Sequence, residues 1–86
     1  MNHFGEFILK QRQVQDRSRR WVERQSKLLF PDEPDRHISH VYLKQLEEGS
    51  SSNPGLLKLR TLSAVLGINE KKLLGVAGFF GEAPEE

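Results

Sequence analysis

The chain has 86 residues, of which 36% are hydrophobic and 29% charged, so a single small folded domain is expected and a disordered tail is excluded. There is no cysteine, which excludes disulfides and thiolate metal sites. No apolar run approaches the roughly 20 residues of a membrane span, and the N-terminus lacks the regions of a signal peptide, so a cytoplasmic protein is expected.

The first part of the chain predicts two helices. Residues 3–15 form the first, because Phe4 and Ile8 lie four apart on one face and no proline interrupts them. Ser18 is a good N-cap for a second helix over 18–29, since its hydroxyl can accept a backbone N–H of the first turn. Two adjacent rows of this helix are apolar, formed by Trp21 with Leu28 and by Val22 with Leu29.

A loop and a third helix follow. Residues 30–38 contain two prolines and predict a loop, from which Ile38 enters the core. Ser39 can cap a helix over 39–48, and Gly49 can end it in the left-handed conformation. The apolar face of this helix consists of Tyr42, Leu43 and Leu46.

The C-terminal part predicts two more helices. Asn53 and Pro54 are a strong start for a helix over 54–66, which Gly67 ends. Asn69 caps a short helix over 70–77, followed by Phe79 and Phe80, a candidate dimer contact, and by an acidic tail over 81–86. No strand pattern is present, so the expected fold is an all-α bundle of five helices within residues 1–80.

Basic residues are concentrated near the start of the second helix. The formal net charge is only +1, but residues 10–27 carry seven basic residues against two acidic ones. This local excess favours an anionic partner on one face of the molecule.

Five sequence pieces occur in a characteristic order: Phe4-Gly5-Glu6 with Ile8 and Arg12, Ser18 to Glu23, Ile38 to Gly49, Asn53-Pro54 with Leu66-Gly67-Ile68, and Lys72 to Phe79. Together they resemble the phage repressor and Cro type of helix-turn-helix domain, the Xre-like family of bacterial regulators. The likeness covers roughly residues 4–80 and implies a lambda-repressor-like five-helix fold that binds DNA.

One departure from this family concerns the connection between the second and third helices. The family usually has a tight turn there, whereas this chain has Ser26 to His37, about ten residues more. Either the second helix continues for a turn before a loop, or the loop is a surface excursion, which costs little closure entropy. We expect the two helices to keep their mutual angle, because Ile38 can fill the core position that in the family precedes the third helix.

The resemblance also implies which residues contact DNA. Side chains at the start of the third helix, namely His40, Val41, Lys44 and Gln45, would approach base edges, and their chemistry suits bases. Arg19, with Ser18 and Arg20 beside it, occupies the position of a phosphate contact. Further backbone contacts would come from Ser39, Ser50, Ser51 and Asn53.

Two other constellations have more ordinary interpretations. The resemblance assigns Arg12 and Glu47 to an ion pair between the first helix and the end of the third. His37 and His40 with Asp32 and Asp35 could bind zinc, but exposed loop residues explain them better, so no metal or other cofactor is expected. No catalytic pairing of side chains is recognisable, so an enzyme is not expected.

The sequence therefore predicts sequence-specific binding of double-stranded DNA by a transcriptional regulator, with repression the favoured role. A homodimer is expected, because one such module reads few base pairs. The alternative is a protein-interaction module on the same fold, such as an antitoxin or the cytoplasmic domain of a cell-shape protein; the long insertion and Trp21 favour it.

Overall fold

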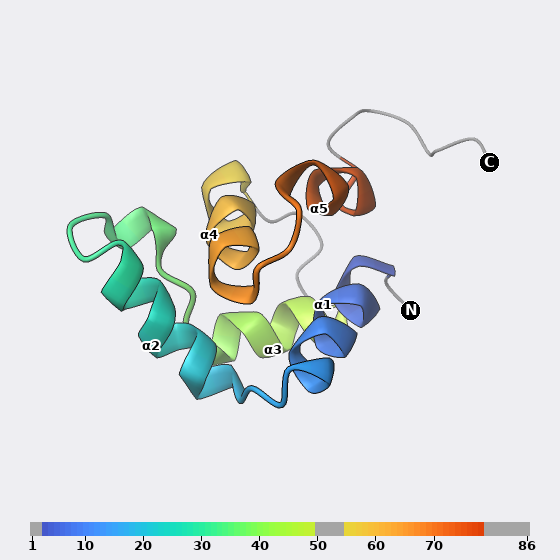
Figure 1. The fold of residues 1–86 in the computed structure, drawn as a ribbon, viewed down its shortest axis with the longest axis horizontal. Helices are drawn as coiled ribbons and strands as arrows, with labels where there is room; N and C mark the ends of the chain where they lie inside the picture. The colour runs from blue at the N-terminus through green and yellow to red at the C-terminus, as the bar shows by residue number, and fades with distance from the viewer. Residues whose placement is uncertain (1–2, 50–54, 79–86) are drawn as a thin grey trace.

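The computed structural model of the protein describes residues 3–49 and 55–78 (Figure 1). These residues form five α-helices, one 3₁₀ helix and no strand, which confirms the predicted all-α class. The elements are α1 (His3–Val14), α2 (Arg19–Leu29), η1 (Pro34–Arg36), α3 (His40–Glu48), α4 (Leu56–Leu66) and α5 (Glu70–Val76).

Local capping signals account for most helix boundaries. The side chains of Ser18 and Ser39 each accept a hydrogen bond of 3.0 Å from the backbone N–H three residues later, and Asn69 does the same at 2.9 Å. Gly49 and Gly67 end α3 and α4 with φ angles of 82° and 67°, which glycine adopts at little cost.

The predicted start of α4 was two residues early. Gly55 is the N-cap and has an extended backbone, with φ −72° and ψ 162°, so the helix begins only at Leu56. Asn53 and Pro54, which were expected to start the helix, lie outside the described residues, as do Ser50, Ser51, Phe79, Phe80 and the tail 81–86.

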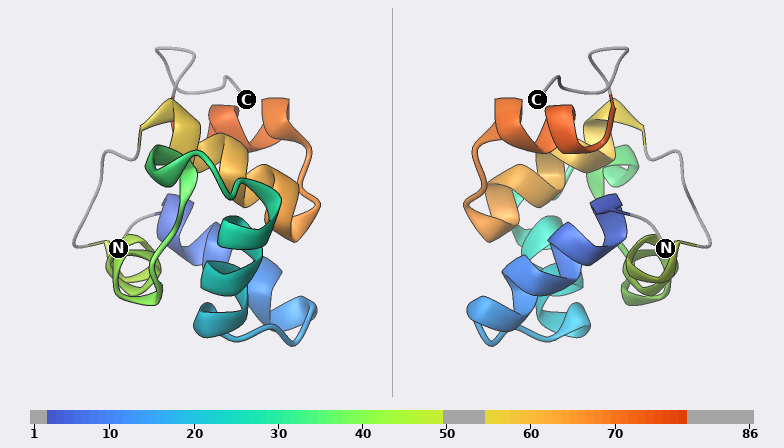
Figure 2. Two further views of the ribbon diagram at one scale, coloured as in Figure 1. Left: turned by 90° about the vertical axis from the view of Figure 1, so that its left-hand side faces the viewer. Right: turned by 90° about the vertical axis from the view of Figure 1, so that its right-hand side faces the viewer.

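The helices pack in two tiers, one formed by α1, α2 and α3 and the other by α4 and α5. α1 and α2 both contact α3, and α4 contacts α2 and α5 (Figures 1 and 2). The core between them consists of Phe4, Ile8, Val22, Ile38, Leu43, Leu46, Leu59, Leu62, Leu66 and Leu73. Trp21, which belongs to a predicted apolar row of the second helix, is only partly buried against this core. No helix of the described residues is long and apolar enough to cross a membrane.

The C-terminal turn of α2 differs from the predicted apolar pattern. Leu28 and Leu29 are 71% and 50% exposed. The buried row of α2 instead joins Val22 to Ser26. The hydroxyl of Ser26 donates to Glu23 O and accepts from Ile38 N at 3.0 Å, so a buried polar residue fixes the chain where it returns to the core.

The connection between α2 and α3 is held by specific contacts. α2 continues to Leu29, and η1 lies within the remaining residues. The His37 ring hydrogen-bonds Phe30 O at 2.7 Å, and the Arg36 guanidinium lies 3.7 Å from the centre of the Phe30 ring. Lys58 Nζ of α4 donates to His37 O at 2.6 Å, which ties this connection to the fourth helix.

Candidate nucleic-acid interface

The N-terminal ends of α2 and α3 border one surface depression of about 600 Å³. Its lining is mostly basic and polar, with one apolar residue, Val41; the other residues are Arg12, Ser18, Arg19, Arg20, His40 and Lys44. Six of these seven residues are among those that the sequence assigns to DNA contact. Gln45 is exposed on α3 but does not line the depression, and Ser39 lies exposed at the N-cap of α3.

A buried carboxylate joins three helices beneath this surface. Glu47 of α3 accepts from Arg12 Nε at 2.8 Å and from Arg12 Nη2 at 3.0 Å, so the ion pair implied by the family resemblance is present. Arg19 Nε of α2 also donates to Glu47, at 2.9 Å. The Glu47 side chain is 1% exposed, so its charge is compensated almost entirely by these two arginines.

The Glu47 network changes the role expected for Arg19. The sequence assigns this residue to phosphate, but its Nε is already bound to Glu47, so the side chain also supports the fold. The side chain remains 34% exposed, and its terminal nitrogens have no hydrogen bond among the described residues. Arg20 is exposed and has no ion pair with any described residue, so it is the arginine of this pair best able to meet a phosphate.

The serines at this surface serve as helix caps. The oxygens of Ser18 and Ser39 each accept a backbone N–H. A hydroxyl that accepts in this way still has its own hydrogen to donate, so capping leaves both serines able to bind a phosphate oxygen.

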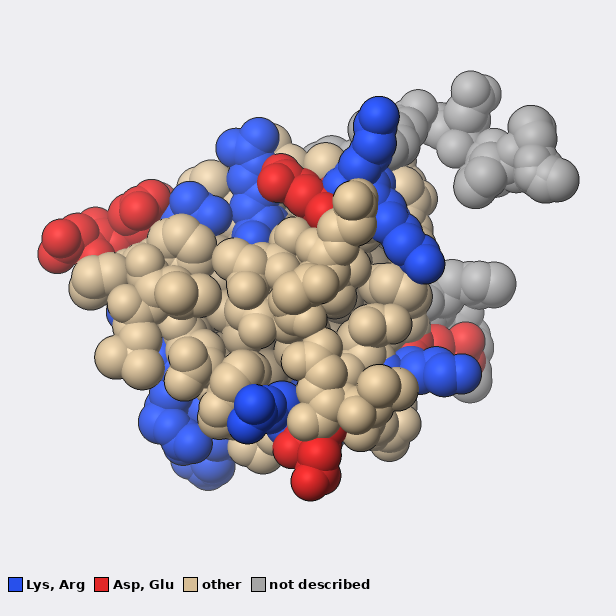
Figure 3. Space-filling model, viewed as in Figure 1, with Lys and Arg blue, Asp and Glu red and all other residues tan. Residues whose placement is uncertain are grey.

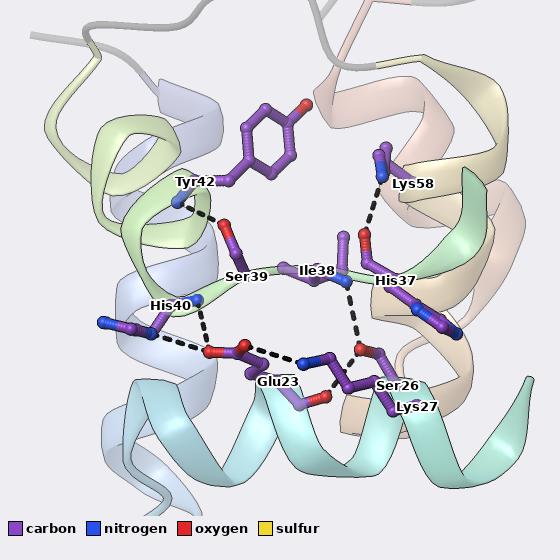
Figure 4. A network of polar contacts seen from close by, with 9 residues as sticks. All are labelled: Glu23, Ser26, Lys27, His37, Ile38, Ser39, His40, Tyr42 and Lys58. Carbon is purple, nitrogen blue, oxygen red and sulfur yellow. Dashed lines mark hydrogen bonds and ion pairs between the residues drawn. The ribbon is translucent and has the colours of Figure 1, made fainter. Parts of the chain in front are cut away.

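A second polar network fixes the beginning of α3 (Figure 4). Glu23 Oε1 of α2 accepts from the backbone N–H of His40 at 3.0 Å and contacts His40 Nδ1 at 2.6 Å. Lys27, one turn further along α2, donates to Glu23 Oε2 at 3.1 Å. The side-chain hydrogen bond from His40, followed by the backbone hydrogen bond from the same residue and by Lys27, lowers the pKa of Glu23 from 4.5 to about 2.

The lowered pKa of Glu23 predicts a pH-dependent contribution to stability. Because the folded state favours ionised Glu23, the contribution is complete above pH 4.5 and is lost as the pH falls towards 2. The free energy of unfolding of Glu23→Gln should therefore lie below that of the wild type near neutral pH and approach it in acid. Urea unfolding at a series of pH values measures the difference, and a constant difference down to pH 2 would contradict the assignment.

The histidines do not come together as metal ligands. His37 bonds to Phe30 O and His40 to Glu23, and they face different partners (Figure 4). Within residues 3–49 and 55–78 no group of three or more His, Cys, Asp or Glu side chains is arranged to hold a metal ion.

Sequence reasoning missed Glu23 and Ser26 as organisers of the α2–α3 junction. The spacing of Glu23 and Lys27 does indicate an i,i+4 ion pair on a helix. Nothing in the spacing indicates that Glu23 reaches the start of a helix 17 residues later, because that contact depends on how the two helices pack.

Comparison with known proteins gives no relative. No family model, no curated protein and no solved structure matches the chain. The resemblance to the Xre-like regulators therefore depends on the sequence pieces quoted above.

Proposed function

We propose that the protein binds double-stranded DNA sequence-specifically and regulates transcription, with repression as the favoured outcome. In this proposal α2 and α3 are the two helices of a helix-turn-helix motif, and α3 enters the major groove. The observation that carries the proposal is the basic depression at the N-terminal ends of both helices.

The location of this depression suits a phosphate backbone. The N-terminus of a helix carries free backbone N–H groups and a partial positive charge, which favour anions. Here the N-terminal end of α2 borders the depression together with the exposed cations of Arg20 and Lys44, whereas at α3 the first backbone N–H, that of His40, already donates to Glu23. Phosphate oxygens are the abundant ligands that match both features.

The size and outer face of α3 suit the major groove. An α-helix with its side chains is about 10–12 Å in diameter, and the major groove of B-DNA is about 12 Å wide. Val41, Lys44 and Gln45 are exposed on this helix. Valine can contact a thymine methyl group, lysine can donate to guanine, and glutamine can pair with adenine.

The networks beneath the surface support such a role, because a reading helix must be held in a fixed orientation. Glu47 connects the last turn of α3 to α1 and α2, and Glu23 connects its first turn to α2. In this proposal residues 26–37 include an insertion relative to the family's tight turn. Buried Ile38 and the Ser39 cap at the entry into α3 support this arrangement.

The functional unit in this proposal is a homodimer on two half-sites. One copy presents only the short helix α3 to the groove, and a single module reads few base pairs. Two copies related by a twofold axis would read half-sites about one helical turn apart.

Two substitutions should weaken DNA binding in different ways. Gln45→Ala should lose about 1–3 kcal/mol on the selected site and little on random duplex, because only base edges differ between sequences. Arg20→Ala should weaken binding to both and reduce the salt slope by roughly one unit, because phosphates recur at every step. Fluorescence anisotropy with a selected and a random duplex at several salt concentrations measures both effects.

Lys71→Ala provides the matched control, since it removes one exposed cation from α5, which does not border the depression. It should leave both affinities within about twofold and the salt slope unchanged. If Lys71→Ala weakened binding as much as Arg20→Ala, the loss of affinity in Arg20→Ala would reflect the lower net charge of the protein and not a contact of Arg20 with phosphate. If the wild type bound neither duplex at low salt, the DNA proposal would be wrong.

Protein binding is the second candidate, and exposed apolar residues favour it. Leu28 and Leu29 at the end of α2 are 71% and 50% exposed. In the space-filling view the middle of the face shown carries no charged residue, whereas charged side chains of both signs lie towards its edges (Figure 3). Such a surface suits a protein partner. If the protein does not bind duplex DNA at low salt, protein binding becomes the leading candidate function.

A further inference from the structure

His40 is the one residue at the depression whose hydrogen-bonding role depends on where a proton lies. A neutral imidazole has one nitrogen that donates and one that accepts, and the partner of one nitrogen decides the role of the other. His40 Nδ1 lies 2.6 Å from Glu23 Oε1. The chemistry of Glu23 therefore determines what the other nitrogen offers to a ligand.

The contacts of Glu23 require it to be an acceptor. Oε1 already accepts the backbone N–H of His40, a group that can only donate, and Oε2 accepts from the ammonium of Lys27. A carboxylate in this setting has no hydrogen to give to a ring nitrogen. Its low pKa agrees, since it is ionised throughout the neutral range. The hydrogen between the two side chains must therefore be on His40 Nδ1.

The remaining ring nitrogen is available to a ligand. His40 Nε2 is on the ring edge that points away from Glu23 (Figure 4), and it has no hydrogen bond to any residue of the described ranges. The side chain is 35% exposed, and the ring lines the basic depression. With the hydrogen held on Nδ1, the neutral ring presents Nε2 as an acceptor in a depression whose cationic residues, such as Arg20 and Lys44, can only donate.

We propose that Glu23 is a positioning residue that fixes the tautomer of His40, so that the protein recognises a base with an amino group in the major groove, either adenine N6 or cytosine N4. Only these two bases offer a hydrogen-bond donor there, whereas guanine and thymine offer acceptors at the corresponding atoms. This inference rests on the proposed function. It states which bases His40 recognises, which the presence of a histidine at the depression does not decide by itself.

The tautomer is tested first, on the free protein. Nitrogen-15 NMR of the histidine rings, recorded well above the ordinary pKa of imidazole, distinguishes a protonated from an unprotonated ring nitrogen. The expected spectrum has His40 Nδ1 protonated and Nε2 unprotonated. In Glu23→Ala both tautomers should be populated, whereas Glu23→Gln should keep much of the wild-type pattern because its carbonyl oxygen still accepts. Lys27→Met is the control, since it removes a partner of Glu23 without touching His40.

The base is tested next, on duplexes built from the selected site. At the position that depends on His40, adenine is replaced by nebularine, or cytosine by the pyrimidinone without its 4-amino group. Loss of this one hydrogen bond should weaken the wild type about fivefold. His40→Ala and Glu23→Ala, shown by circular dichroism to be folded, should both discriminate less than about twofold. Lys27→Met should discriminate as the wild type does.

The outcomes separate this inference from the proposed function. A hydrogen on Nε2 at neutral or higher pH, in either the neutral or the charged ring, overturns it whatever DNA does. A protein that binds its selected site but is indifferent to every amino-group deletion also overturns it, and leaves DNA binding intact. A protein with the expected tautomer that binds no duplex refutes the proposed function and the base assignment with it.

Discussion

Glu47→Ala should destabilise the protein by about 3 kcal/mol, a large part of the stability of a small domain. The carboxylate is 1% exposed and accepts from two nitrogens of Arg12 and one of Arg19. Removing it leaves two guanidinium groups near each other without their counter-charge, and Arg12 is only 13% exposed. An uncompensated charge in such a place costs much more than the net value of the pair that held it.

The chain contains a matched control for this substitution. Arg60 and Glu70 form an ion pair of 2.8 Å, the same distance as Arg12 with Glu47, but both side chains are nearly half exposed. Glu70→Ala should cost less than about 1 kcal/mol, because solvent screens exposed pairs. Urea unfolding of both variants measures the contrast. Equal losses in the two variants would show that burial of Glu47 adds nothing.

The Glu47 network also explains why one part of the site was predictable and another was not. The Arg12–Glu47 pair follows from the family resemblance, and the structure contains it. The participation of Arg19 does not follow, because the resemblance assigns this residue to phosphate. A long side chain at the start of α2 can reach either inward or outward, and only the packing of α2 on α3 decides which carboxylate it meets.

The helices themselves were predictable because their signals are local. Ser18, Ser39 and Asn69 form the expected caps, and Gly49 and Gly67 end helices with positive φ. Each signal depends on residues within one turn, so no knowledge of the fold is needed. The start of α4 shifted to Leu56 because Gly55 is extended, a conformation that the preceding Asn-Pro pair does not reveal.

Periodicity predicted which face of a helix is apolar but not how far the core extends along it. Leu28 and Leu29 continue the apolar rows of α2, yet both side chains are exposed. As a polar residue within a helix, Ser26 is not expected in the core. It is nevertheless fully buried, and its hydroxyl oxygen accepts the backbone N–H of Ile38. Contacts between residues 12 or more apart cannot be inferred from the pattern of one helix.

Gly5→Ala should lower the stability by about 2–3 kcal/mol, against the usual effect of this substitution in a helix. Alanine favours a helix over glycine by up to about 1 kcal/mol, so the sign of the change tests the packing. Gly5 is buried where α1 meets α3. A Cβ there would lie 2.6 Å from Glu47 O and would also collide with Leu46 O. Both obstacles are backbone atoms of α3, so no side-chain rotation relieves the contact and the helices must separate.

Gly55→Ala is the control for Gly5→Ala, because a Cβ at Gly55 meets nothing within 4 Å and its φ is −72°. It should cost less than about 1 kcal/mol, the ordinary difference at an N-cap.

Separation of α1 from α3 should also weaken the Arg12–Glu47 pair, which crosses the same interface. The combined loss in Gly5→Ala with Glu47→Ala should therefore fall short of the sum of the single losses by roughly 0.5 kcal/mol or more. Additive losses, or a Gly5→Ala protein more stable than the wild type, would mean that α1 and α3 do not approach as closely as the Gly5 contact requires.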